Sequence, residues 1–135
     1  GIFCLSPEGL QGAVLHMAAT SLAEYLRLHL NGTPLTLIIG ILDDKAYPAI
    51  LQTLAPFCRR IIVTRAETGR AIPPDTLAAA ARQLNEAVAV TQSVEAAIDL
   101  ALADLPPEEA ICIAGSLYVA GEARAVFIQK GWIRE

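Results

Sequence analysis

Four short apolar runs, separated by longer amphipathic segments, dominate the hydrophobic pattern of this chain. The runs are residues 35–42 (LTLIIGIL), 60–64 (RIIVT), 87–91 (AVAVT) and 110–114 (AICIA). Each consists mainly of β-branched or aliphatic residues, without a polar residue at every second position. This pattern is typical of β-strands that are buried on both faces of a sheet.

The segments between these runs repeat apolar residues three or four positions apart, which places them along one side of a helix. Pro73-Pro74 and Ser93 stand where two of the helices begin, and Pro106-Pro107 ends a helix. Asn31-Gly32 ends the first helix. The predicted helices are residues 20–30, 46–57, 74–85, 93–105 and roughly 119–130.

Strands that alternate with helices of about a dozen residues imply right-handed crossovers and parallel strands. The length of 135 residues is that of one domain. The sequence therefore predicts a Rossmann-like three-layer α/β/α domain, with a mainly parallel sheet and helices on both faces.

Composition and charge exclude two classes of partner. Hydrophobic residues make up 54% of the chain, but polar or turn residues interrupt every apolar run before the length of about 18 residues that a membrane span needs. The net charge is -4, and the ten Lys and Arg residues are scattered except for Arg59-Arg60. We therefore expect neither a membrane nor a nucleic acid as a partner.

The three cysteines, Cys4, Cys58 and Cys112, are far apart in the sequence and form no C-x-x-C pair. This spacing argues against a zinc site and against a disulfide framework, and Cys112 is expected to be a small buried residue. A secretory signal requires basic residues at its start, and residues 1–12 contain none. These features favour a location in the cytoplasm.

Ligands of parallel sheets bind outside the carboxyl ends of the strands. The loops to consider are therefore residues 43–45 (Asp-Asp-Lys), 64–73, 91–93 and 115–116 (Gly-Ser). Several acidic residues at helix surfaces or turns, Glu67, Asp104 and Glu109 among them, are expected to be solvated. No histidine has a second ligand at metal-binding spacing, so no metal site is predicted.

Two of these loops contain groups that suit an anion. Gly115 allows close approach of the backbone ahead of a helix N-terminus, and Ser116 adds a hydroxyl. Lys45 offers a positive charge to a carboxylate or phosphate, with Asp44 to orient it or to cap the helix. The alternatives are a packing glycine followed by a capping serine, and a solvated lysine.

Three motifs carry a resemblance to a known family: G-x-x-x-D-K at residues 40–45, R-A-x-P at 70–73, and G-S-L-Y-x-x-G-E-x-R at 115–124. In this order and spacing, over roughly residues 18–128, the chain resembles the C-terminal domain of folylpolyglutamate synthase/dihydrofolate synthase in the Mur ligase superfamily. Members of that family use ATP to form an acyl phosphate on a pterin or folate carboxylate, which the amine of glutamate then attacks.

The resemblance implies that this domain helps to hold glutamate and closes over a central ATPase domain that binds ATP and magnesium. By position in the motifs, Lys45 would pair with a glutamate carboxylate, while Ser116 and Tyr118 would complete the pocket. Arg70 is a further candidate for a phosphate or carboxylate, and an exposed loop arginine without a ligand is the alternative.

The chain departs from the family in two respects. It contains no G-x-x-x-x-G-K-[ST] phosphate loop, so we expect no cofactor bound by this chain alone and no ligase turnover. The family's Asp-Gly-Ala-His-Asn-Pro motif is also missing, and His16 does not replace its histidine. We therefore expect that residues 1–17, Gly1 to Met17, are partly or wholly foreign, and that residues 18–135 form the family domain.

If residues 1–17 are foreign, either GAVLH (residues 12–16) replaces the native first strand or an exposed sheet edge pairs with a second copy, giving a homodimer. Three functions are then open. The chain is an isolated glutamate-binding domain of a folate-type amide ligase, an engineered or selected folded module without ligand chemistry, or an unrelated nucleotide- or flavin-binding doubly wound domain.

Overall fold

The computed structural model describes residues 2–6, 9–15, 23–24, 27–28, 34–42, 46–106, 109–115 and 117–131. Its strands are β1 (Ile2–Ser6), β2 (Gly9–Leu15), β3 (Leu35–Gly40), β4 (Arg60–Val63), β5 (Val88–Val90) and β6 (Ala110–Gly115). Its helices are α2 (Tyr47–Leu54), the 3-10 turn η1 (Ala55–Phe57), α3 (Pro74–Arg82), α4 (Val94–Ala103) and α5 (Leu117–Gln129). Of the predicted first helix, residues 23, 24, 27 and 28 are described, and they are helical.

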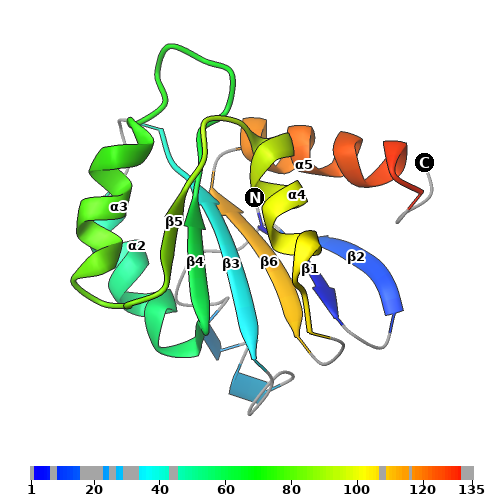
Figure 1. Ribbon diagram of the computed structural model, residues 1–135, viewed down its shortest axis with the longest axis horizontal. Helices are drawn as coiled ribbons and strands as arrows, with labels where there is room; N and C mark the ends of the chain where they lie inside the picture. Colours follow the sequence, from blue (N-terminus) through cyan, green and yellow to red (C-terminus); the bar gives the residue numbers. More distant parts are fainter. Residues whose placement is uncertain are drawn as a thin grey trace.

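The six strands form one sheet in the order β2-β1-β6-β3-β4-β5 (Figure 1). Strands β6, β3, β4 and β5 are parallel to their neighbours, whereas β1 runs antiparallel to both β6 and β2. Helices α2 and α3 lie on one side of the sheet, and α4 and α5 lie on the other (Figure 1). The predicted three-layer, mainly parallel α/β fold is confirmed.

Alternate residues of the central strands belong to two separate cores. Leu37, Ile39 and Ile61 pack with the buried residues of α2 and α3. Ile38 and Ile62 pack on the opposite face with α4 and α5, where Phe127 is fully buried. Because apolar residues are needed on both faces, the strands show no polar alternation, and this is why they appear in the sequence as continuous apolar runs.

The ends of the helices follow local chemistry. Ser93 caps α4, since its Oγ accepts a hydrogen bond from the Ala96 N–H at 3.1 Å, and Pro74 occupies the first turn of α3. Helix α3 ends at Arg82, three residues earlier than expected. Beyond it, the Asn85 side chain donates to the Cys58 carbonyl at 3.0 Å and accepts from the Ala87 N–H at 2.7 Å. These bonds hold the turn that leads into β5.

The N-terminal segment completes the sheet. Strand β1 pairs along β6, so the edge of β6 is covered, and β2, which contains most of the GAVLH segment, is an outer strand. The GAVLH segment therefore pairs with β1 and not with β6, and whether either strand replaces a native one stays a prediction. Whether residues 1–17 are foreign to the domain and whether an outer strand pairs with a second copy both stay predictions.

The cysteines differ from expectation at one position. Cys112 is fully buried in β6, as predicted, but it is disulfide-bonded, so the expectation that the chain lacks a disulfide is wrong there. Contacts between distant strands decide such pairing, and cysteine spacing does not reveal them. Cys58 is a free thiol whose Sγ lies 3.2 Å from the Leu54 carbonyl oxygen, and burial raises its pKa to about 12.

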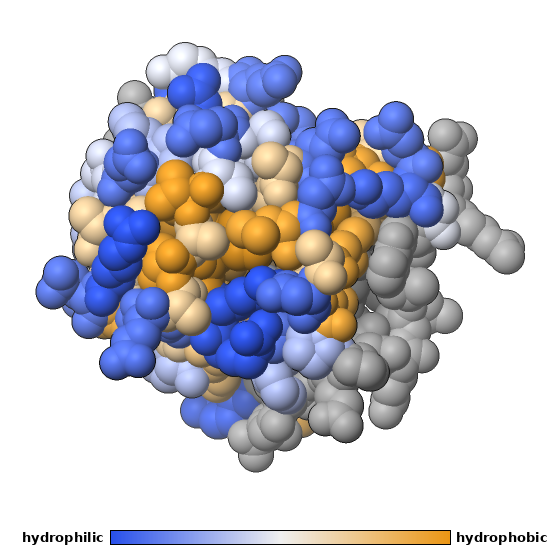
Figure 2. All heavy atoms as spheres, viewed as in Figure 1, coloured by the Kyte–Doolittle hydropathy of each residue, from blue (hydrophilic) through white to orange (hydrophobic). Residues whose placement is uncertain are grey.

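The surface seen in this view carries a band of apolar side chains flanked by polar ones (Figure 2). The outer strand β5 is half-buried along its length, and Leu84 and Leu100 are exposed. With three residues, β5 offers only a short edge for pairing with another strand. In the described part of the chain, none of the helices combines the length and the apolarity that crossing a membrane would take.

Candidate functional site

Four strand-to-helix loops leave the sheet from the same edge, because β3, β4, β5 and β6 are parallel. Two of them start side by side. Gly40, the last residue of β3, is paired in register with Gly115, the last residue of β6. The chain segments that lead to residues 43–45 and to Ser116 therefore depart from neighbouring positions at the carboxyl edge.

Glycine is required where these strands end. Gly115 has a φ of 141°, and a Cβ placed on it would lie 1.9 Å from the Gly40 carbonyl oxygen. A Cβ on Gly40 would lie 3.0 Å from both the Thr64 carbonyl oxygen and Cγ2 of Val119, in the first turn of α5. Gly115 thus permits close packing between β6 and β3, as in the packing alternative, and a role in close approach by a ligand stays a prediction.

Most of the other predicted site residues are not among the residues that the structure describes. Asp44, Lys45 and Ser116 lie outside the described residues, and so does the side chain of Tyr118, whose backbone is in the first turn of α5. Their assignment to a pocket stays a prediction. The flanking residues are described: Leu42 follows β3, Ala46 precedes α2, Gly115 ends β6 and Leu117 begins α5.

The loop that contains Arg70 pairs with residues 41–42, which immediately precede residues 43–45. Ala71 forms an antiparallel bridge with Leu42, and the Ile72 N–H donates to the Ile41 carbonyl at 2.9 Å. The Arg70 N–H lies 3.4 Å from Oγ1 of Thr68, and the Arg70 residue is exposed. The R-A-x-P motif is therefore held beside the G-x-x-x-D-K motif by backbone contacts.

The same loop is also joined to α5. The Glu67 N–H donates to Oε2 of Glu122 at 3.2 Å, and Glu122 is the glutamate of the G-S-L-Y-x-x-G-E-x-R motif. The three motifs, which are far apart in the sequence, thus meet at one edge of the sheet. The residue Glu67 is exposed, as expected, and its backbone N–H makes this contact to Glu122 in addition.

Thr64 is a residue at this edge that the sequence analysis does not single out. It follows β4, it is fully buried, and among the described residues its Oγ1 is the buried side-chain oxygen that lacks a hydrogen-bond partner. The signal in the sequence is a lone polar residue that closes an apolar strand. That signal is weak, because threonine is common in strands.

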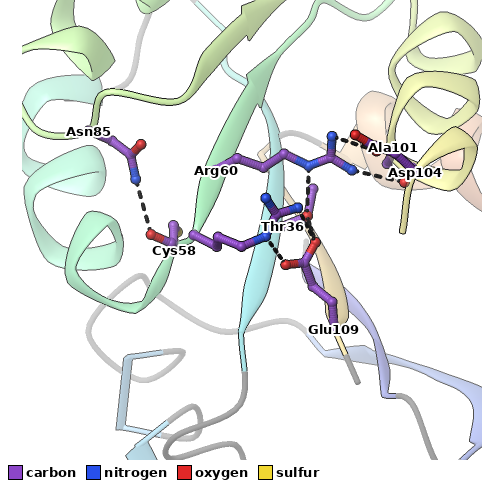
Figure 3. A network of polar contacts seen from close by, with 8 residues as sticks. Thr36, Cys58, Arg60, Asn85, Ala101, Asp104 and Glu109 are labelled. Atoms are coloured by element: carbon purple, nitrogen blue, oxygen red, sulfur yellow. Dashed lines mark hydrogen bonds and ion pairs between the residues drawn. The ribbon is translucent and has the colours of Figure 1, made fainter. Parts of the chain in front are cut away.

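The opposite, amino edge of the sheet holds a connected polar network (Figure 3). The Glu109 carboxylate receives hydrogen bonds from Oγ1 of Thr36 and from the Arg59 guanidinium, whose second contact is 2.8 Å long. Arg60 donates to Oγ1 of Thr36 at 3.0 Å and to the Ala101 carbonyl at 2.9 Å. It also pairs with Asp104 at 2.9 Å. This network joins β3, β4, α4 and the start of β6.

Glu109 corrects an expectation, because it is 2% exposed rather than solvated. Burial disfavours its ionised form, but hydrogen bonds from Arg59 and Thr36 and the positive charges of Arg59 and Arg60 outweigh that cost. The pKa of Glu109 therefore lies below its usual value. This site lies at the end of the sheet away from the loops, and its polar groups are mutually satisfied, so it stabilises the fold and offers no open binding position.

Within the described ranges, no group of three His, Cys, Asp or Glu residues is arranged to hold a metal ion. The groups that the sequence predicts at the carboxyl edge are backbone N–H groups, hydroxyls and basic side chains. Such groups bind anions, carboxylates among them.

Comparison with known proteins agrees with this arrangement. The family model "Mur ligase, glutamate ligase domain" matches residues 15–117. A probable bifunctional folylpolyglutamate synthase/dihydropteroate synthase of Haloferax volcanii is 32% identical over 94 residues, which is 69% of this chain and 11% of the relative.

Two solved structures are similar in both sequence and fold. Folylpolyglutamate synthase from Thermotoga maritima is 33% identical with a TM-score of 0.68, over 84% of this chain and 25% of that one. The Mycobacterium tuberculosis enzyme, complexed with ADP and AMPPCP, is 31% identical with a TM-score of 0.70. The match covers 81% of this chain and 27% of that enzyme.

The chain thus spans about a quarter or less of the length of these relatives, in the region of their C-terminal domain. The family match covers the first two motifs and the first residues of the third, up to residue 117. This chain belongs to the Mur ligase family and corresponds to its glutamate ligase domain, as found in folylpolyglutamate synthases.

Proposed function

We propose that this domain binds glutamate for an ATP-dependent folate-type amide ligase, at the carboxyl edge of its sheet. The observation that carries the proposal is the linkage of the three motifs there. Gly40 pairs with Gly115, Ala71 bridges to Leu42, and Glu122 accepts from the backbone of the loop that contains Arg70. Residues from distant parts of the chain are thereby gathered where an amino acid could be held.

The groups expected at this edge suit a dicarboxylic amino acid. The Lys45 ammonium would pair with one carboxylate, and Ser116 would donate a hydrogen bond beside the N-terminus of α5, with Tyr118 completing the pocket. Arg70, in the adjoining loop, is a second cation for a carboxylate or phosphate. Asp44 would orient Lys45, and Gly115 would keep β6 close to β3.

The rest of the ligase would supply ATP, magnesium and the pterin or folate substrate. ATP would activate the acyl group, and this domain would present the amine of glutamate to it. The described residues contain no cluster of metal ligands, and the chain contains no phosphate loop, so the ATPase domain is the partner that we assign to this domain. We expect no turnover by this chain alone. A location in the cytoplasm is the expectation from the sequence, and the disulfide at Cys112 argues against it, because disulfides are rare in that compartment.

A chimeric ligase tests the proposal. This domain would replace the corresponding domain of the Thermotoga maritima enzyme, and steady-state kinetics would be measured for each substrate. We expect Lys45→Ala to raise KM for glutamate at least about tenfold, with KM for ATP unchanged, because one charge-assisted contact is lost. Ser116→Ala should give a smaller rise.

Lys130→Ala is the matched control, since Lys130 lies after the far end of α5, 2.6 Å from Asp99. Equal KM values for glutamate in the Lys45→Ala, Ser116→Ala and parent chimeras would contradict the proposal and favour a folded module without ligand chemistry. Membership of the Mur ligase family removes the reason to retain an unrelated flavin or nucleotide binder.

A further inference from the structure

Cys112 lies in the middle of β6, between two neighbouring strands. In the register of the sheet it is opposite Leu37 of β3 on one side and opposite Cys4 of β1 on the other. It is fully buried and disulfide-bonded. Of the three cysteines in the chain, Cys58 is a free thiol at the end of η1.

We propose that Cys4 and Cys112 form a cross-strand disulfide that fastens the N-terminal hairpin, β1 with β2, to the parallel part of the sheet. Residues directly opposite each other in an antiparallel pair have Cα atoms about 4.5 to 5.5 Å apart and side chains on the same face. That spacing lies within the range of about 4.4 to 6.8 Å that a disulfide requires. This inference is independent of the proposed function.

The oxidant is a low-molecular-weight disulfide of the glutathione type. One cysteine thiolate attacks the small disulfide, breaks its S–S bond and releases one thiolate. The second cysteine thiolate then attacks the protein sulfur of the mixed disulfide and releases the other. The two protein thiols lose two electrons and two protons, and the small disulfide is reduced to two thiols.

Burial of Cys112 determines when this exchange can happen. The Cys112 sulfur is fully buried, so a small thiol or disulfide reaches that sulfur only when β1 separates from β6. The bond should therefore form during folding and be reduced slowly once the hairpin is in place. It acts as a lasting covalent connection rather than a rapid switch.

Labelling with iodoacetamide in denaturant, followed by intact mass, tests the pairing on the full 135-residue chain refolded with oxidised glutathione. We expect one label, on Cys58, before reduction and three labels after it. Non-reducing peptide mapping should join the peptides of Cys4 and Cys112. Three labels before reduction, or a linkage that includes Cys58, would overturn the proposal.

Thermal unfolding provides the second readout. Because the bond closes a loop of about 100 residues, chain that is reduced in denaturant and refolded in reductant should have a Tm about 10 °C or more below that of the oxidised chain, in the wild type and in the Cys58→Ala control. Cys4→Ser should have the Tm of the reduced wild-type chain, whether or not reductant is present. A wild-type Tm that reductant does not change would contradict a fastening role, even if the bond is present.

Discussion

The carbonyl oxygen of Gly40 occupies the space in which a side chain on Gly115 would have to stand. A Cβ on Gly115 would be only 1.9 Å from that oxygen. These two residues end adjacent parallel strands, and the loops with the best candidate ligand groups begin just beyond them. The close contact therefore sets the separation of the two strand ends from which these loops begin.

Gly115→Ala should lower the free energy of unfolding by at least about 2 kcal/mol, because the new methyl group meets backbone at a positive φ. Urea denaturation followed by circular dichroism measures this change. Gly121→Ala in α5 is the matched control, since nothing lies within 4 Å of its Cβ position. It should be neutral or stabilise by up to about 1 kcal/mol. Similar losses in both variants would contradict this role of Gly115.

Two buried threonines should respond in opposite directions to replacement by valine. The Thr64 hydroxyl lacks a partner, so Thr64→Val should stabilise the fold by about 1 kcal/mol. The Thr36 hydroxyl bonds both Glu109 and Arg60, so Thr36→Val should destabilise it by about 1 to 3 kcal/mol. Chemical denaturation of both variants gives the comparison. A loss at Thr64 equal to that at Thr36 would show that its hydroxyl has a partner.

Glu109 should give the domain a marked sensitivity to acid. Its pKa is lower in the folded chain than the value of about 4.3 expected when unfolded, so its stabilisation is complete above that value. The contribution is lost as pH falls through the folded pKa. We expect Tm of the wild type to fall more steeply below about pH 4 than Tm of Glu109→Gln.

At neutral pH, Glu109→Gln should cost about 2 to 3 kcal/mol. This is less than for a fully buried pair because the Arg59 side chain is 44% exposed. Glu86→Gln, at an exposed turn, serves as the control and should change neither quantity. Parallel acid profiles for wild type and Glu109→Gln would contradict the assignment.

Two arginines in one loop allow a test of the candidate site. Arg65 and Arg70 are both exposed, but only Arg70 adjoins the bridge between Ala71 and Leu42. If the proposed function holds, Arg70→Ala in the chimeric ligase should raise KM for glutamate or ATP by about three- to tenfold, whereas Arg65→Ala should not. Unchanged KM values for both variants would leave Arg70 as an ordinary loop arginine.

The sequence predicts the layers of the fold well because burial on both faces leaves a clear signal. The continuous apolar runs become β3, β4 and β6, and the capping Ser93 starts a helix as expected. The C-terminal end of α3 and the pairing of β1 with β6 are not predicted. They depend on contacts such as that of Asn85 with the Cys58 carbonyl, between residues far apart in the sequence.

The candidate site is predicted in part. Motif order and the parallel topology correctly indicate which loops share an edge, because strand direction fixes where loops leave the sheet. Sequence patterns do not show that Gly115 packs on Gly40, that Thr64 is buried without a partner, or that Glu109 is enclosed by two arginines and a threonine. Each depends on the separation of residues in three dimensions.

The polar network around Glu109 fastens the central strands at the end of the molecule that lies away from the loops. Substitutions in the loops at the carboxyl edge should therefore leave these hydrogen bonds and ion pairs intact. The loops and the scaffold thus have separate sets of stabilising contacts. Protein engineers could use the same separation, grafting loops from one ligase to another while keeping the residues around Glu109 fixed.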